Sequence, residues 1–234
     1  MRDLYTKGEY LANTGTWHAE DSEWKADQIS AMLQRNGVRS NVVHELGCGA
    51  GGVLCALSEK EAFRETSFSG YDISPQAVLL ANSRPVPRVQ VTCADYFALE
   101  TRSTPDVLMA IDVFEHVPDY MGFLENCQRS APYKIYHIPL ELHVSGLLRG
   151  ALLHARRRVG HIHYFSAETA LEVLKDTGHT IVEATFTDLA IDLFHKHPSV
   201  KTALANIPRW VVSKVSKPVS ARWFGGYSLL VLAR

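Results

Sequence analysis

Two patterns alternate along the chain, short runs typical of strands and longer stretches whose hydrophobic residues have helical spacing. Five short runs predict strands between residues 41 and 140: NVVHEL, SFSGYD, VQVTCAD, PDVLMAID and YKIYHIPL. The stretches 53–63, 74–83 and 118–129 lie between these runs and predict helices. Strands that alternate with helices of this length favour right-handed crossovers, so we expect a doubly wound α/β fold whose parallel sheet is covered on both faces.

Residues that begin and end helices support these assignments. Ser74 and Pro75 predict the N-cap and first position of the helix over 74–83, and Pro118 predicts the start of the helix over 118–129. Ser166 and Gly178 mark the two ends of a later helix in the same way.

The pattern continues on both sides of this region. Apolar residues recur at helical spacing over 21–35, and we expect the following glycine, Gly37, to end that helix. Residues 179–189 predict a strand, 199–217 a helix and 226–234 a terminal strand. The stretch 140–165 is apolar and basic without a clear period over most of its length, and we interpret it as an insertion over the sheet.

Composition places the chain among ordinary globular domains. It has 234 residues with 24 Lys and Arg and 25 Asp and Glu, so its net charge of −1 gives no basic footprint and predicts no nucleic-acid partner. The first ten residues carry charges where a signal peptide needs an apolar core, and no run approaches the roughly 18 apolar residues of a membrane span. The four cysteines lack metal-site spacing and predict reduced thiols packed as small apolar groups. We therefore expect a cytoplasmic, single-domain chain over residues 1–234.

The sharpest motif is the glycine-rich turn ELGCGAGG at residues 45–52, between a predicted strand and a predicted helix. Glycines there let backbone N–H groups and a helix N-terminus approach a ligand closely. Gly47, Gly49 and Gly52 match GxGxxG, and Asp72 follows twenty residues later, as in the dinucleotide-binding fingerprint. The spacing alone therefore allows a nicotinamide cofactor as well as other nucleosides.

Three features favour a ligand without phosphate. Glu45 places a carboxylate two residues before the first glycine, where it would repel a pyrophosphate and attract a cationic amino group. The motif begins after about forty residues that contain a helix, whereas dehydrogenases usually open with it. Asp95 follows the next strand and supplies another acceptor at the same edge of the sheet.

With these motifs in order, the chain resembles the class I S-adenosylmethionine-dependent methyltransferases. ELGCGAGG resembles the first motif of that family, GYDIS its acidic motif after the second strand, CADYF its adenine-side motif, and DVFEHVPD the segment after the fourth strand. The resemblance implies a Rossmann-like sheet of order 3-2-1-4-5-7-6 with an antiparallel last strand, and S-adenosylmethionine as cofactor with S-adenosylhomocysteine as product. The N-terminal region is similar to the N-terminal segments of a bacterial subgroup of small-molecule methyltransferases. The resemblance implies a biosynthetic enzyme of the glycan-cluster or ubiquinone type.

The resemblance also implies roles for individual residues. The glycines would line the methionine part of the cofactor, Glu45 would lie near its amino group, and Asp72 would accept from the ribose hydroxyls. Asp95 would lie near the adenine amine, with Tyr96 or Phe97 beside the ring. The expected cofactor-binding set is Glu45, Gly47, Cys48, Gly49, Gly51, Asp72, Ile73, Asp95, Tyr96 and Asp112.

Histidines supply the candidate catalytic groups, because an alcohol or phenol acceptor must lose its proton. His116 follows the fourth strand and either contacts the acceptor as a base or, with Glu115, caps the next helix. His161 and His163 alternate along an extended segment and either border the acceptor pocket or bond the strand edge while Tyr164 and Phe165 pack in the core.

Asp112, Glu115 and His116 could together hold a divalent ion, as some quinone-ring relatives suggest. The chain offers no independent set of ligands, however, and we predict no metal.

Other polar residues have open roles. His137 and His143 line the acceptor mouth, or His137 is a hydrogen-bonded core residue. The basic residues Arg149, Arg156, Arg157 and Arg158 form a solvated helix face or grip an anionic group of the acceptor. Over residues 1–40 the chain forms either a lid that includes Trp17, His18 and Trp24, or a helix capped by Asp21 or Ser22 with Trp24 in the core.

The combined prediction is a methyltransferase that acts on a small-molecule or glycan-type acceptor, at oxygen. By the same resemblance, the insertion over 140–165 lies on the acceptor side. A nicotinamide-dependent oxidoreductase and a non-catalytic cofactor-binding subunit are the alternatives, and the sequence does not define the oligomeric state.

Overall fold

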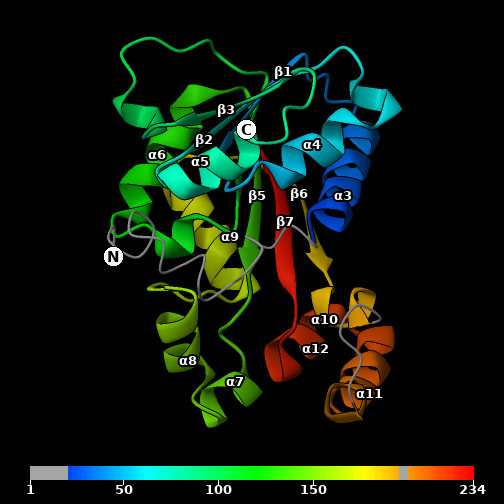
Figure 1. Ribbon diagram of the computed structural model, residues 1–234. Helices are drawn as coiled ribbons and strands as arrows, with labels where there is room; N and C mark the ends of the chain where they lie inside the picture. The colour runs from blue at the N-terminus through cyan, green and yellow to red at the C-terminus, as the bar shows by residue number, and fades with distance from the viewer. Residues whose placement is uncertain (1–20, 195–199) are drawn as a thin grey trace.

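Within residues 21–194 and 200–234, which the computed structural model describes, seven strands form one sheet in the order β3-β2-β1-β4-β5-β7-β6 (Figure 1). Strands β1 to β5 are parallel, and β7 runs antiparallel to both of its neighbours. The expected doubly wound fold and strand order are therefore confirmed. The strands are β1 (Val42–Leu46), β2 (Ser67–Asp72), β3 (Val89–Cys93), β4 (Val107–Ile111), β5 (Tyr133–Pro139), β6 (Ile181–Thr187) and β7 (Ser228–Ala233).

Helices cover the two faces of this sheet and bury a separate cluster on each. One cluster joins alternate strand residues to α3 (Ser22–Arg35), α4 (Gly52–Ser58) and α5 (Pro75–Asn82), and the other joins the remaining strand residues to α6 (Tyr120–Ser130) and α9 (Ala167–Asp176). Strand β4 is apolar throughout because both of its faces are buried. Val107 and Met109 point into the first cluster and Leu108 and Ala110 into the second, as a central parallel strand requires.

The first crossover helix is shorter than its sequence pattern predicts. Helix α4 ends at Ser58, and a short 3₁₀ turn, η2 (Glu61–Phe63), returns Phe63 to the core beside Phe68. Arg88 stabilises this ending because its guanidinium donates to the carbonyl oxygens of Ser58, Phe63 and Thr66 at 2.6–3.1 Å. The helix predicted over 53–63 is therefore wrong beyond Ser58, since a distant arginine satisfies the carbonyls that the helix leaves unpaired.

Other helix ends follow local chemistry. Ser74 caps α5 by accepting from the Ala77 amide, and Ser166 forms a capping box with Thr169 at the start of α9, both as predicted. Pro118 was the wrong start for α6, because Asp119 is its N-cap and accepts from the Gly122 amide at 3.0 Å.

The helix predicted over 199–217 corresponds to α11 (Val200–Val215), and the sequence pattern missed a second helix that follows it, α12 (Lys217–Phe224). Ser216 separates them, because its hydroxyl accepts from the Val219 amide as the N-cap of α12.

A group of helices lies at the carboxyl ends of the parallel strands, at the bottom of Figure 1. Helices α7 (Val144–Leu148) and α8 (Ala151–Arg158) follow β5, while α10 (Leu189–Asp192), α11 and α12 connect β6 to β7. Half of the stretch 140–165 is thus helical, and it projects from this edge. None of the described helices is both long and apolar enough to cross a membrane.

Candidate active site

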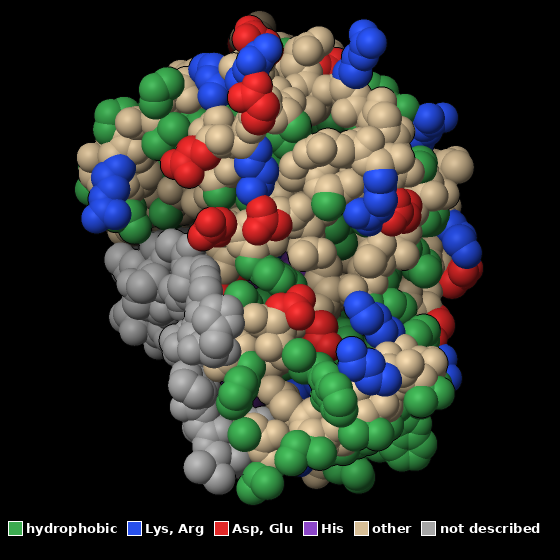
Figure 2. Space-filling view, turned by 90° about the vertical axis from the view of Figure 1, so that its right-hand side faces the viewer, with side chains coloured by type: hydrophobic (Ala, Val, Ile, Leu, Met, Phe, Trp, Pro, Cys, Tyr) green, Lys and Arg blue, Asp and Glu red, His purple; other side chains and the backbone are tan. Residues whose placement is uncertain are grey.

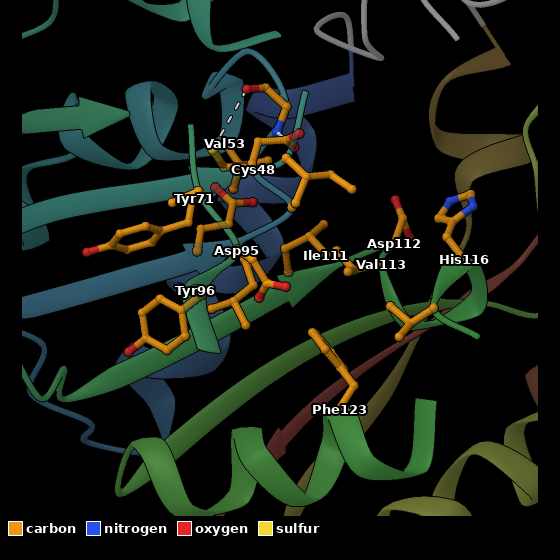
Figure 3. A pocket seen from close by; sticks show the side chains of 18 of the residues that line it. Cys48, Val53, Tyr71, Asp95, Tyr96, Ile111, Asp112, Val113, His116 and Phe123 are labelled. Carbon is orange, nitrogen blue, oxygen red and sulfur yellow. Dashed lines mark hydrogen bonds between the residues drawn. The ribbon is translucent and has the colours of Figure 1, made fainter. Parts of the chain in front are cut away.

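A cavity of about 470 Å³ opens at the carboxyl ends of β1, β2, β3 and β4 (Figure 3). This edge is where doubly wound sheets bind ligands, because strand order reverses there. Nine of the ten expected cofactor-binding residues line the cavity, the exception being Gly51. Its lining includes Lys25, Glu45, Gly47, Cys48, Gly49, Asp72, Ile73, Asp95, Tyr96, Phe97, Asp112, Val113, His116 and Phe123.

The glycine turn forms one wall because its backbone conformation excludes side chains. Gly47 has a φ of +65°, and a Cβ there would lie 2.7 Å from Cγ2 of Val113. Gly51 has a φ of +74° and serves as the N-cap residue of α4. We conclude that Gly51 shapes the turn, while Gly47, Cys48 and Gly49 present their surface to the cavity.

Asp72 ties the turn to the end of β2. Its two carboxylate oxygens accept from the backbone amides of Gly49 and Ser74, each at 2.8 Å. Burial raises the pKa of Asp72, and these amide hydrogen bonds oppose the rise. The carboxylate is therefore held in a fixed orientation at the cavity wall, as a hydroxyl-binding role requires.

Glu45 is a buried carboxyl group with an unused oxygen. It is 2% exposed, and its Oε2 has no hydrogen-bond partner among the described residues. Burial raises its pKa to about 8, although the nearby Lys25 ammonium lowers it. A buried polar atom without a partner is costly in a folded protein, so this oxygen suits a ligand that brings a donor or a positive charge.

Asp112 lies at the end of β4 with a φ of +55°, and its carboxylate contacts Lys25 and His137. Its Oδ2 is 2.8 Å from Lys25 Nζ, and its Oδ1 is 2.7 Å from His137 Nδ1. Burial opposes its negative charge, but Lys25 and His137 outweigh burial and lower its pKa. Lys25 could not be predicted from the sequence, since its helix α3 reaches the site only through the tertiary fold.

The aromatic residues near Asp95 divide into a buried and an accessible group. Tyr96 is buried, and its hydroxyl lies 3.2 Å from His44 Nδ1. Phe97 is less buried, and its ring meets Phe123 of α6 edge-on at 5.6 Å. Both Tyr96 and Phe97 line the cavity, so the ring of a nucleoside base has aromatic neighbours there.

His116 lines the cavity beside Asp112, at the end opposite Cys48 and Tyr71 (Figure 3). It lies in the 3₁₀ turn η4 (Phe114–His116), and its Nδ1 is 3.2 Å from the carbonyl oxygen of Gly160. Because a carbonyl only accepts, Nδ1 carries the hydrogen. In the neutral ring Nε2 is then the basic atom.

Glu115 and His161 lie next to His116. Glu115 is fully buried, and within residues 21–194 and 200–234 neither of its carboxyl oxygens has a hydrogen-bond partner. Burial raises its pKa well above the ordinary value. His161 packs against the His116 ring at 4.6 Å, and its own Nδ1 is 2.7 Å from Glu141 Oε2. His161 itself does not line the cavity.

Ligand atoms of Glu115, His116 and His161 lie within 4.8 Å of one another. The set that the sequence offered as a metal alternative contained Asp112 in place of His161. Asp112 instead pairs with Lys25 and His137.

The remaining candidate histidines have structural partners. His163 lies outside the cavity, its Nε2 donates to the Val117 carbonyl at 3.0 Å, and its ring packs on Tyr120. His137 is buried, as its core interpretation predicts, and its second nitrogen lies 3.0 Å from the Thr187 hydroxyl. His143 caps α7, because its Nδ1 accepts from the Gly146 amide.

The other predictions are placed as follows. Trp24 is partly buried rather than in the core, and its indole N–H donates to Asp192 at 3.2 Å. Trp17 and His18 lie outside the described residues.

Among the cysteines, all of which are free thiols, Cys93 is exposed, contrary to the expectation of packed thiols. The four arginines of the 140–165 stretch are exposed and lie away from the cavity.

The donor set suits a nucleoside that carries a cationic amino-acid group. Glu45, Asp72 and Asp95 supply acceptors, and Lys25 is already paired with Asp112. A diphosphate would meet the carboxylates of Asp72 and Asp95 with like charge. S-adenosylmethionine, which has no phosphate, therefore fits the residues better than a nicotinamide dinucleotide.

Comparison with known proteins agrees with this chemistry. The family model described as a methyltransferase domain matches residues 17–184, more than half of the chain. The ubiquinone biosynthesis O-methyltransferase of Nitrosomonas europaea is 31% identical over 126 residues, which are 48% of this chain and 52% of that protein. The chain thus spans about half the length of the curated relatives it matches.

Solved structures share the fold. The complex of the Trm112 methyltransferase activator with a methyltransferase from Haloferax volcanii matches 99% of this chain and 96% of the other, with a TM-score of 0.65 and 18% identity. Magnesium protoporphyrin IX methyltransferase from Synechocystis, solved with bound S-adenosylhomocysteine, matches 90% of this chain and 82% of its own, with a TM-score of 0.59 and 15% identity.

Proposed function

The chain belongs to the methyltransferase domain family, and on that basis we propose that it uses S-adenosylmethionine to methylate a hydroxyl group of a small-molecule or glycan-type acceptor. One observation carries the proposal: the unpartnered carboxyl oxygen of Glu45 and the imidazole of His116 line the same cavity. The first suits a cationic cofactor and the second suits removal of a hydroxyl proton.

In this proposal the carboxylates and the glycine turn hold the cofactor. Glu45 receives its amino group, Asp72 its ribose hydroxyls and Asp95 its adenine side, where Phe97 and Tyr96 lie. Gly47 and Gly49 allow the close approach because they carry no side chain. The bound cofactor supplies an activated methyl group, so the chain's own part is to orient the acceptor, exclude water and remove a proton.

His116 is the proposed base. The Gly160 carbonyl keeps the hydrogen on Nδ1, which leaves Nε2 to take the proton of the acceptor hydroxyl. Glu115 Oε1 is 3.9 Å from this Nε2, so the Glu115 carboxyl group lies beside the imidazolium that forms when His116 takes the proton. His161, fixed by Glu141, is the positioning residue for the ring.

Two observations support an oxygen acceptor, and the class of acceptor rests on resemblance. The curated relatives with 30–31% identity are O-methyltransferases, and an oxygen acceptor needs a base such as His116, whereas an amine can react without one. The stretch 140–165 contributes Gly160 and His161 to the surroundings of His116, which supports its place on the acceptor side. A cytoplasmic location stays a prediction from the sequence.

The test is transfer of an isotope-labelled methyl group to a panel of phenols, sugars and amines of similar size. The proposal predicts a product whose labelled carbon is bonded to oxygen in its NMR spectrum. His116→Asn should abolish most of this product while S-adenosylhomocysteine still binds. Transfer to the amines alone would contradict the oxygen acceptor.

Binding of S-adenosylhomocysteine with no transfer to any acceptor, in a chain that raises the activity of an added methyltransferase, would instead identify a non-catalytic subunit.

A further inference from the structure

Four helices at the carboxyl edge of the sheet, α7, α8, α11 and α12, pack together as one block. The Ser145 hydroxyl of α7 donates to the Phe224 carbonyl of α12 at 3.2 Å. Arg209 of α11 donates to the carbonyl of Gly225, just after α12. Helices that are distant in sequence therefore form a common surface, which we call the basal surface (Figure 1).

Most of the exposed large hydrophobic side chains in the described parts of the chain lie on the basal surface. Ten of the fourteen exposed large hydrophobic residues among the described parts of the chain belong to these four helices. On α11 they form a stripe with helical spacing, and Val215 at its end is 89% exposed. Figure 2 shows hydrophobic side chains gathered on the lower part of this face. The ten are Leu147, Leu148, Leu153, Leu204, Ile207, Trp210, Val211, Val215, Val219 and Trp223.

Charge is segregated onto the same part of the chain. Residues 142–167 contain four arginines and residues 193–234 contain seven Lys and Arg, and neither stretch has a single Asp or Glu. All 25 acidic residues therefore lie elsewhere, which a net charge of −1 conceals. The exposed basic side chains on or beside the block are Arg149, Arg156, Arg157, Arg158, Lys214, Lys217 and Arg222.

We propose that the basal surface docks the protein on an anionic membrane, with the apolar stripe of α11 and α12 at the headgroup boundary. Exposed apolar residues with Trp on one face and Lys or Arg around them are typical of helices that lie in a bilayer interface. A nucleic acid would use the basic residues and leave the apolar stripe in water. A protein partner would account for the apolar stripe of α11 and α12. It would not account for the lack of acidic residues in the stretches 142–167 and 193–234.

The position of this surface relates it to the cavity. Helix α7 follows β5, and the cavity opens beyond the ends of β1 to β4, so both lie at the same edge of the sheet. The docking itself needs neither cofactor nor acceptor. Failure of the proposed methyl transfer would therefore not contradict the proposed docking, and failure of the docking would not contradict the methyl transfer.

The experiment is cosedimentation of the full chain with vesicles of phosphatidylcholine alone or mixed with phosphatidylglycerol. We expect binding to the mixed vesicles that falls as salt rises, and far weaker binding to phosphatidylcholine alone. Replacing Arg156, Arg157 and Arg158 together with Gln should weaken binding by roughly fivefold per arginine. Arg64→Gln, an exposed arginine outside the block, is the control and should bind normally.

The apolar part is tested with Val211→Asp combined with Val215→Asp, both on exposed positions of α11. This variant should lose vesicle binding, whereas Leu79→Asp, at a 74% exposed position on α5, should retain it. Wild-type chain that stays in the supernatant at low salt would overturn the proposal. So would a dimer that the α11 variant splits into monomers without any vesicle binding, because the stripe would then be a self-association surface.

Discussion

Lys25 of α3 and Asp112 at the end of β4 form an ion pair of 2.8 Å at the wall of the cavity. The pair joins the N-terminal helix to the strand that leads to His116, across 87 positions of sequence. His137 holds the other oxygen of Asp112 at 2.7 Å. The left-handed backbone of Asp112 is thus fixed from two sides.

Removing the Lys25 charge should destabilise the fold. We expect Lys25→Met to lower the free energy of unfolding by about 1–3 kcal/mol in urea denaturation at pH 7, because Asp112 keeps a largely buried charge with one partner fewer. The double variant with Asp112→Asn should recover part of the loss. Because the pKa of Asp112 is lowered in the folded chain, its contribution is present above about pH 4 and disappears as pH falls further. An unchanged midpoint for Lys25→Met at pH 7 would show that the pair does not stabilise the fold.

Glu45 should release a proton when the cofactor binds. Burial raises its pKa to about 8 in the free chain, so most molecules carry it neutral at pH 7. A cationic amino group favours the carboxylate, and binding of S-adenosylhomocysteine should release close to one proton. Calorimetry in two buffers of different ionisation enthalpy measures this number. Glu45→Gln should release none, and equal proton release from both chains would assign the proton to another group.

The glycine turn can be probed by adding a methyl group. Gly47→Ala should cost about 2–4 kcal/mol of stability, because strain at positive φ adds to a Cβ contact of 2.7 Å with Val113. Gly37→Ala is a matched control, since its φ is +63° but nothing lies within 4 Å of the added Cβ. It should cost only about 1 kcal/mol. Equal losses in thermal or urea unfolding would mean that Val113 moves aside freely.

His116 should affect turnover rather than cofactor affinity. His116→Asn should lower the rate with a hydroxyl acceptor by roughly 10²–10⁴-fold, the usual contribution of a positioned base, and leave S-adenosylhomocysteine affinity within a factor of about two. His161→Asn should have a smaller effect on rate and shift the pH profile, because it removes the contact that orients His116. His154→Asn, an exposed histidine on α8, is the control. Equal rates for His116→Asn and the control would exclude His116 as the base.

Much of the fold follows from local sequence. Most strands are short, largely apolar runs with helical stretches between them. Ser74 and Ser166 cap their helices through bonds to residues three positions away. The helix end at Ser58 was not predictable, because it depends on Arg88, thirty positions later.

The cofactor side of the site was also accessible from sequence, since its residues lie in short motifs at strand ends. Lys25 and Glu141 were not, because each meets its partner, Asp112 or His161, only in the folded chain. The unpartnered oxygens of Glu45 and Glu115 depend on burial, which a motif does not report.

The central claim is that this cavity binds a nucleoside with a cationic amino-acid group and no phosphate. Calorimetric titration with S-adenosylhomocysteine and with a reduced nicotinamide cofactor tests it most directly. The account predicts binding of the first only, weakened roughly ten- to hundredfold in Asp72→Ala and unchanged in Asp27→Ala, an exposed aspartate on α3. Binding of the nicotinamide cofactor alone, or normal affinity in Asp72→Ala, would contradict it.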